Sequence, residues 1–271
     1  MLISVIISTY NNPLWLEKVL WGYANQDDRN FEIVVADDGS DESTRSLITR
    51  FEEGRSMPPI KHVWHEDRGF RKSAILNKAT LAAAGEYLVF TDGDCIPPRD
   101  FIAIHRRLAK PGQFLSGGYF KLPMGISEII DKNAVDSGQV FALRWLWSRG
   151  MPRTFKSLRL GAVSLLRGIL DRFVPTKPTW NGNNSSAFRD TIIDVNGHDE
   201  RMAYGGQDVE MGYRLVHSGI KPRRIRYRAL VLHLDHKRGY ADPSSIAKNL
   251  QIRQNTLKLR IQRTDYGIVG K

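Results

Sequence analysis

Short apolar runs alternate with more polar or alanine-rich segments over the first hundred residues. The runs lie at residues 2–8, 31–36 and 86–91, and a further short strand is expected at 60–65, where apolar and polar residues are mixed. Continuous apolar runs of this length are typical of strands that are buried on both faces in a parallel sheet. The intervening segments, at 13–24, 42–53 and 71–84, predict helices. Strands and helices that alternate at this spacing predict an α/β fold with a mostly parallel central sheet flanked by helices.

The remaining residues are less regular and predict more helix than strand. Residues 126–173 are rich in Arg, Trp and Leu and predict a mostly helical insertion. A further helix is expected at 207–217, and a strand at 226–233. Asp242, followed by proline, predicts the start of a C-terminal helix. No clean linker separates these segments, so we expect a single domain over residues 1–271.

Charge is distributed unevenly along the 271 residues, whose net charge is +11. Residues 1–100 hold 11 basic and 16 acidic side chains, whereas the rest of the chain holds 29 and 13. A basic half favours an anionic partner, with a solubilising surface as the alternative. No nucleic-acid-binding motif is present, so nucleic acid is not expected as a partner. No apolar stretch approaches the ~20 residues that cross a bilayer, and the single cysteine, Cys95, favours a reducing compartment.

Two acidic clusters follow two of the predicted strands. Asp92, Gly93 and Asp94 come after the run at 86–91, and the sequence Asp-Asp-Gly-Ser-Asp at 37–41 follows an earlier run. Open parallel sheets bind ligands at the carboxyl ends of their strands, so we expect both clusters at one edge. Paired carboxylates suit a hard divalent cation, and a carboxylate also accepts hydrogen bonds from a base or a ribose. Asp-Gly turns and helix capping are the alternatives.

Together these motifs resemble those of the family 2 inverting glycosyltransferases of the GT-A fold. The resemblance covers roughly residues 2–100 and rests on Ser-Val-Ile-Ile-Ser-Thr-Tyr-Asn at 4–11, residues 37–41, residues 68–77 and Thr-Asp-Gly-Asp at 91–94. It implies an enzyme that transfers a sugar from a nucleotide-sugar donor, UDP-linked by resemblance, to an acceptor hydroxyl. The donor contacts that it implies are Thr9, Tyr10, Asn11, Asp37, Asp38, Arg68, Arg71, Asp92 and Gly93.

The second half resembles the catalytic region of the galactosyltransferase-like enzymes of the same fold. The matching residues are Asn181-Gly-Asn-Asn184, Gly205-Gly-Gln-Asp208 and His233-Leu-Asp-His236. The resemblance implies that Asp208 is the base that deprotonates the acceptor, and inversion by a single displacement needs one such base. Acceptor or sugar contacts are expected from Asn181, Asn183, Gly206 and Gln207. Gln207 stands where the family has glutamate, which weakens any role that requires charge. Capping of the following helix is the alternative role for Gln207 and Asp208.

A divalent metal, Mn²⁺ or Mg²⁺, is implied as the cofactor. Asp94 and His233 are its expected ligands, and His236 is a less favoured one that can instead contact the diphosphate. A pair of partly exposed histidines is the alternative. Trp180 is expected either to stack on a sugar face or to lie in the core.

Residues 144–177 combine eight basic side chains with one acidic side chain, Asp171. The basic residues are Arg144, Arg149, Arg153, Lys156, Arg159, Arg167, Arg172 and Lys177. The apolar residues between them are Trp145, Trp147, Phe155, Leu158, Leu165, Leu166, Ile169, Leu170 and Phe173. Such a mixture suits an interfacial helix on an anionic membrane surface, and a core helix pair with a solvated basic face is the alternative. We therefore expect a peripheral protein on the inner face of a bacterial cytoplasmic membrane. Its expected acceptor is a lipid-linked saccharide, such as a lipopolysaccharide or polysaccharide precursor.

Other classes of protein fit the motifs less well. A nucleotidyltransferase also places an acidic pair on an α/β sheet, but it normally has a Gly-rich basic loop that residues 9–13 do not offer. A non-catalytic sugar-binding protein could lose Asp208, which this chain keeps. We therefore expect a nucleotide-sugar-binding half at 1–100. An acceptor-binding and catalytic half at 101–271 follows, with its basic insertion at about 126–177.

Overall fold

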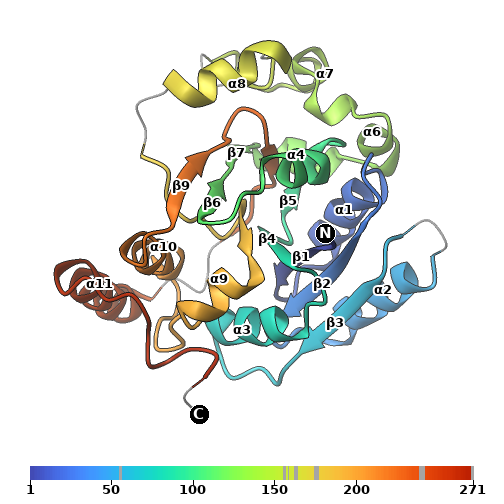
Figure 1. Ribbon diagram of the computed structural model, residues 1–271. Helices are drawn as coiled ribbons and strands as arrows, with labels where there is room; N and C mark the ends of the chain where they lie inside the picture. The colour runs from blue at the N-terminus through green and yellow to red at the C-terminus, as the bar shows by residue number, and fades with distance from the viewer. Residues whose placement is uncertain are drawn as a thin grey trace.

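The computed structural model describes residues 1–54, 57–154, 157, 159–161, 164–173, 177–237 and 242–269 (Figure 1). A seven-stranded sheet with the order β3-β2-β1-β4-β8-β6-β9 runs through its centre. β8 is antiparallel to both of its neighbours, and the other pairs in this sheet are parallel. The strands are β1 (Ile3–Thr9), β2 (Phe31–Asp37), β3 (Ile60–Trp64), β4 (Tyr87–Asp92), β6 (Gln113–Ser116), β8 (Ser185–Phe188) and β9 (Lys221–Arg224). The mostly parallel central sheet predicted from the sequence is confirmed.

Strand register brings the ends of three parallel strands to one level. Thr9, the last residue of β1, lies opposite Asp37, the last residue of β2. On the other side of β1, Ser8 lies opposite Asp92 at the end of β4. The two acidic clusters therefore share one edge of the sheet, as expected for the carboxyl ends of parallel strands.

Helices cover both faces of this sheet, which explains why its central strands β1, β2 and β4 are largely apolar and buried. In β1, Ile3, Val5 and Ile7 pack into one core, and Ile6 packs into a second core on the opposite face. The first core includes side chains of α1 (Pro13–Ala24), α2 (Glu42–Glu52) and α4 (Phe101–Leu108). The second includes side chains of α3 (Lys72–Ala82), α9 (Arg189–Asp194) and α10 (Gln207–His217). The sheet is thus the middle of three layers.

A smaller sheet extends the structure beside β4. Its order is β5 (Cys95–Ile96), β10 (Leu230–His233) and β7 (Gly118–Lys121). Gly117 lies between β6 and β7. A side chain does not fit at this position, because a Cβ on residue 117 would lie 2.1 Å from the side-chain amide of Asn184. That amide donates to the carbonyl oxygens of Gly118 and Ala229. The chain therefore changes sheets at a glycine.

The described part of the basic insertion folds as several short helices. They are α5 (Met124–Ile129), α6 (Lys132–Asp136), the 3₁₀ helix η1 (Gln139–Phe141), α7 (Leu143–Ser148) and α8 (Ser164–Phe173). Figure 1 shows α7 and α8 at the rim of the molecule, away from β1 and β2. Across the described parts of the chain, every helix is too short or too polar to cross a bilayer.

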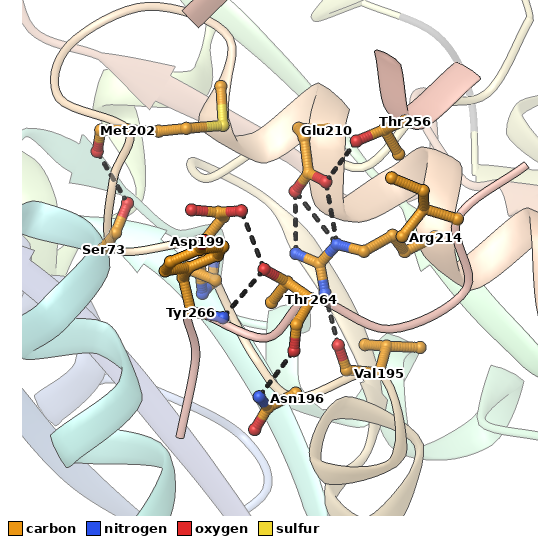
Figure 2. A network of polar contacts seen from close by, with 12 residues as sticks. Ser73, Val195, Asn196, Asp199, Met202, Glu210, Arg214, Thr256, Thr264 and Tyr266 are labelled. Atoms are coloured by element: carbon orange, nitrogen blue, oxygen red, sulfur yellow. Dashed lines mark hydrogen bonds and ion pairs between the residues drawn. The ribbon is translucent and has the colours of Figure 1, made fainter. Parts of the chain in front are cut away.

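A buried polar network connects α10 with the C-terminal helix α11 (Pro243–Lys258) (Figure 2). Arg214 forms two-point contacts with Glu210 one turn earlier, and Thr256 of α11 donates to the same carboxylate at 2.9 Å. Arg214 also donates to the carbonyl of Val195. Nearby, Thr264 donates to Asp199 at 2.7 Å. The network fixes α10 and the segment 195–199 relative to each other.

Candidate active site

A cavity of about 730 Å³ opens at the carboxyl edge of the large sheet, where the small sheet and α10 meet it. Its volume lies within the range of small-ligand sites, roughly 300–1,000 Å³. The lining includes predicted site residues from both halves of the chain: Thr9, Tyr10, Asp38, Asp92, Gly93, Asp94, Asn183, Gln207, Asp208, His233 and His236. Residues as far apart in the sequence as Thr9 and His236 therefore meet at one place.

Asp92, at the end of β4, is held by two protein donors. Ser8 donates to its Oδ1 at 2.7 Å, and the ammonium of Lys72 lies 2.5 Å from the same oxygen. Burial disfavours the charged form of Lys72, but the carboxylates of Asp92, Asp208 and Asp94 outweigh it and raise the pKa of Lys72. Lys72 is therefore a fixed cation among three carboxylates. No pattern in the sequence indicated this role.

Asp94 faces two histidines, His233 at the end of β10 and His236 just after it. Its Oδ2 lies 3.0 Å from Nε2 of His236 and 3.8 Å from Nε2 of His233. Each ring points Nδ1 at a backbone carbonyl, at 2.7 Å for His233 and 2.9 Å for His236. Because Nδ1 of each ring faces a carbonyl, Nε2 is the nitrogen that each ring turns toward Asp94. Burial raises the pKa of Asp94, but contacts with the two histidines exceed that effect and hold it below its ordinary value.

The thiol of Cys95 adds a third kind of ligand atom to this group. Asp94, Cys95 and His233 bring one such atom each to within 4.8 Å of one another. However, burial raises the pKa of Cys95 well above its ordinary value, and its thiol points at Asp94 at 3.3 Å. A neutral thiol is a poor ligand. Asp94, His233 and His236 are therefore the better set of candidate ligands.

Asp208 stands in the first turn of α10, after the left-handed glycines Gly205 and Gly206. A Cβ on Gly182 would lie 2.8 Å from both of its carboxylate oxygens, so this side of the carboxylate is closely packed. Burial raises the pKa of Asp208, but His198 and Lys72 outweigh this and hold the pKa below its ordinary value. An anionic carboxylate thus faces the cavity in the position that the sequence predicts for a base.

The second acidic cluster divides into one cavity residue and one structural residue. Asp38 lines the cavity, and its two oxygens accept from Nε2 of His65 at 2.7 Å and the backbone N–H of Arg71 at 2.9 Å. Burial raises the pKa of Asp38 despite these contacts. Asp37 is fully buried and outside the lining; it accepts from the Ser40 amide and contacts His62. Asp37 therefore stabilises the turn after β2, and its donor contact stays a prediction.

Three further donor contacts predicted from the sequence lie outside the cavity lining. Asn11 ties the loop after β1 to the loop after β2, since its backbone donates to Ser40 and its side chain accepts from the Asp41 amide. Arg68 forms an exposed ion pair with Glu66, and the Arg71 guanidinium donates to the Glu66 carbonyl. These side chains hold their own loops together, and their contacts with the donor stay predictions.

Of the two roles expected for Trp180, the structure shows the core position, because the ring is fully buried. It packs edge-on against Phe90 at 5.4 Å and Phe114 at 5.6 Å, within the second core. A ring in this position offers no face to a sugar, so the core alternative holds. Asn181 and Gly206 likewise lie outside the cavity lining, whereas Asn183 lines it.

Gln207 replaces the glutamate of the related motif without losing its local contact. Its side-chain oxygen accepts from the backbone N–H of Gly205 at 3.0 Å. An amide oxygen can accept this bond as well as a carboxylate can. Gln207 lines the cavity, so the change removes a negative charge from the site while the turn before α10 keeps its hydrogen bond.

Aromatic and basic side chains that the sequence argument missed complete the lining. They include Phe70, Lys72, Tyr119, Lys121 and Tyr204. Phe70 and Tyr204 contact each other edge-on at 5.8 Å, and Tyr119 packs beside His233 at 5.6 Å. Each comes from a loop, a helix start or a strand of the smaller sheet, where no local motif signals its direction.

Comparisons with known proteins agree with this geometry. The sequence profile described as Glycosyl transferase family 2 matches residues 4–114. Validoxylamine A glucosyltransferase from Streptomyces hygroscopicus subsp. jinggangensis (strain 5008) is 29% identical over 257 residues, which are 92% of this chain and 59% of that protein. This chain therefore spans less than two thirds of the length of that relative.

Solved structures show the same fold. A mannosyltransferase from Pyrobaculum calidifontis, in complex with GDP-Man and Mn²⁺, is similar with a TM-score of 0.57 at 21% identity, over 95% of this chain and 70% of that one. S. aureus TarS 1-349, in complex with UDP-GlcNAc, gives a TM-score of 0.62 at 15% identity, over 93% and 65%. Residues 4–114 thus match the family 2 glycosyl transferase profile, and the chain has the GT-A-like α/β fold of these transferases.

Proposed function

We propose that this protein is an inverting glycosyltransferase that moves a sugar from a nucleotide-sugar donor, preferably UDP-linked, to an acceptor hydroxyl. One observation carries the proposal: a partly buried, anionic Asp208 faces the same cavity as Asp38 and the group formed by Asp94 and two histidines. The relative's name and the nucleotide sugars bound to the two similar structures support it.

The reaction is a single displacement at the anomeric carbon. The acceptor oxygen forms a bond to that carbon, and the bond to the diphosphate oxygen breaks with its electron pair leaving on the diphosphate. Asp208 takes the acceptor hydroxyl proton as the new bond forms. Lys72 is charged and lies within the cavity, where its ammonium offsets negative charge on a bound diphosphate.

The residues around Asp94 fit a divalent metal. Nε2 of each histidine lies within 3.8 Å of one Asp94 oxygen, and mixed oxygen and nitrogen ligands suit Mn²⁺, which would bind these nitrogens in their unprotonated form. We propose Asp94, His233 and His236 as its ligands. When bound, the metal would stabilise negative charge on the leaving diphosphate.

Replacing the proposed base tests the mechanism. Asp208→Asn keeps the size of the side chain and removes its proton-accepting charge. We expect donor affinity to survive while kcat falls by ~10²-fold or more. The measurement is nucleotide release from UDP-glucose, UDP-GlcNAc and GDP-mannose, with the donor affinity measured by calorimetry.

Asp190→Asn is the matched control, because Asp190 is an exposed carboxylate on α9. Turnover by Asp208→Asn near that of Asp190→Asn would reject Asp208 as the base. Glu210 would not replace it, because its carboxylate is buried against Arg214 and Thr256. Donor binding without turnover in the unaltered protein would instead favour a non-catalytic sugar-binding protein.

We also propose that α8 docks the enzyme on an anionic membrane that carries a lipid-linked acceptor. Leu166, Ile169 and Phe173 are 50%, 51% and 75% exposed and recur at helical spacing on one face of α8. The buried Asp171 on the same helix accepts from the Tyr227 amide at 2.7 Å and the Arg228 side chain at 2.6 Å. These contacts fix α8 with its apolar ridge outward, where interfacial helices bury such side chains.

Other parts of the basic segment contribute less than expected to this surface. Trp145 and Trp147 pack partly against the core, under the guanidinium groups of Arg149 and Arg153. Phe155, Lys156 and Leu158 lie outside the described residues, as does the side chain of Leu165. The proposed membrane surface is therefore the ridge of α8 with Arg167 and Arg172 on the same helix.

Sedimentation with liposomes tests the membrane surface. Each basic residue near an anionic leaflet contributes about 1 kcal/mol, so reversing Arg167 and Arg172 to Glu should lower binding by well over 10-fold. The same reversal at Arg45 and Arg50, exposed on α2, is the matched control and should leave binding intact. Binding should also vanish in high salt. No binding of the unaltered protein to anionic liposomes at low salt would end this proposal in favour of a soluble acceptor.

A further inference from the structure

His198 lies behind Asp208, outside the cavity lining, in the segment between α9 and α10. Its side chain is fully buried, and its Nε2 lies 3.7 Å from Oδ1 of Asp208. Among the residues that the structure describes, neither ring nitrogen of His198 has a hydrogen-bond partner, and neither does Oδ1 of Asp208. A donor and an acceptor that are both buried and unpaired therefore face each other just beyond hydrogen-bonding distance.

Buried polar atoms are nearly always paired, because an unpaired one loses its hydrogen bonds to water and gains none in return. The backbone N–H and carbonyl of His198, in contrast, are both hydrogen-bonded. Its N–H donates to the Asn77 side chain at 2.8 Å, and its carbonyl accepts from the same amide at 2.9 Å. The ring packs beside Phe90 at 5.7 Å. Asn77 and Phe90 thus hold the imidazole in place beside Asp208.

We propose that His198 is a positioning residue for the base: its Nε2–H holds Oδ1 of Asp208 and leaves the other carboxylate oxygen to receive the acceptor proton. The inference rests on the proposed role of Asp208. A closure of less than 1 Å would turn the 3.7 Å contact into a hydrogen bond. A donor on one carboxylate oxygen also fixes which lone pair faces the acceptor, as the orienting partner of a catalytic base does in other enzymes.

Three groups face the Asp208 carboxylate from separate elements. Lys72 comes from α3, His198 from the segment before α10, and the backbone N–H of Gly182 from the loop before β8. Lys72 is shared with Asp92, which its ammonium contacts directly. His198 has no other polar contact for its ring among the described residues, so its effect is directed at Asp208.

Three substitutions separate positioning from packing. His198→Phe keeps a flat ring beside Phe90 and removes the N–H. His198→Gln places an N–H near the position of Nε2, and His198→Asn places one near Nδ1 instead. If His198 holds Asp208, the phenylalanine variant should lower kcat by ~10-fold or more with little change in donor affinity, and glutamine, but not asparagine, should restore it.

Two readouts complete the test. The first is the pH dependence of nucleotide release from the active donor. The second, which needs no substrate, is a titration of ¹³C-labelled aspartate carboxyls followed by NMR, with the Asp208 signal assigned by its loss in Asp208→Asn. Removing a donor from a carboxylate raises its pKa. In His198→Phe the Asp208 signal should therefore titrate at higher pH, and the acidic limb of kcat should move upward with it.

The outcomes distinguish this inference from the function on which it rests. An Asp208 pKa that is the same in the unaltered protein and in folded His198→Phe would overturn the inference, whatever the activity. A His198→Phe variant too unstable to titrate leaves His198→Gln and His198→Asn as the decisive pair, and equal kcat values in these two would also overturn it. A shifted Asp208 titration together with full turnover in Asp208→Asn would instead reject Asp208 as the base.

Discussion

Gly182 shows how the absence of a side chain sets the position of the proposed base. A Cβ at this residue would lie 2.8 Å from both carboxylate oxygens of Asp208, closer than real Cβ contacts occur. The sequence placed Gly182 in a polar loop before a strand, but nothing in it indicated which distant side chain packs there. Close approach to a residue 26 positions away is a property of the folded chain.

We expect Gly182→Ala to displace the Asp208 carboxylate and to lower kcat by ~10-fold or more, because small displacements of a catalytic group are costly. Donor affinity and folding should change little. Gly125→Ala is the control, since a Cβ there meets no atom within 4 Å. Equal kcat values for the two variants, measured by nucleotide release, would show that Asp208 is not fixed by this contact.

Lys72 and Trp180 mark the limit of residue-level prediction. A lysine at a helix start resembles any solvated lysine in a sequence, yet this one is held at 2.5 Å from Asp92. Trp180 precedes a polar loop and resembled a sugar-stacking ring, yet it is fully buried between Phe90 and Phe114. In both cases the direction of the side chain depends on tertiary contacts that local pattern does not encode.

At the scale of elements, β1, β2 and β4 could be predicted because burial on two faces makes them largely apolar. Elements that depend on distant partners could not. β6 ends at Ser116 and β7 begins at Gly118, because Asn184 from another part of the chain packs against Gly117. The short helices between Met124 and Phe173 follow the surface of the core rather than a periodic pattern of their own.

The packing of α10 against α11 depends on the buried ion pair between Glu210 and Arg214, because Thr256 of α11 donates to the same carboxylate. Glu210→Ala would leave the fully buried Arg214 guanidinium without its carboxylate, because Val195 supplies only a carbonyl. We expect a loss of about 3–5 kcal/mol in the free energy of unfolding, as for other broken buried pairs. Urea titration measures it.

Glu128→Ala removes an exposed glutamate from α5 and should stay within about 0.5 kcal/mol of the unaltered protein. If Glu210→Ala proved equally mild, the network of Figure 2 would not be what holds α10 in place.

At the scale of the whole molecule, the site forms where the regular first half of the chain meets the less regular second half. Residues 4–114 match the family profile and supply Asp38, Asp92 and Asp94 at one sheet edge. The second half supplies Asp208, His233 and His236, which reach the same cavity through α10 and β10. The motifs of both halves were readable in the sequence, but the sequence could not show that they converge or which of their neighbours point inward.

Release of nucleotide from a donor, with the metal controlled, tests the central claim most directly. UDP-glucose, UDP-GlcNAc and GDP-mannose would each be incubated with the protein in Mn²⁺ and in EDTA, beside Asp94→Ala. We predict that one donor releases its nucleoside diphosphate in Mn²⁺, that EDTA stops the release, and that folded Asp94→Ala shows neither turnover nor Mn²⁺-dependent binding of UDP or GDP. Turnover that persists in EDTA, or unchanged metal-dependent nucleotide binding by Asp94→Ala, would contradict the proposed metal site. Failure of all three donors to bind in Mn²⁺ would contradict the proposed glycosyltransferase.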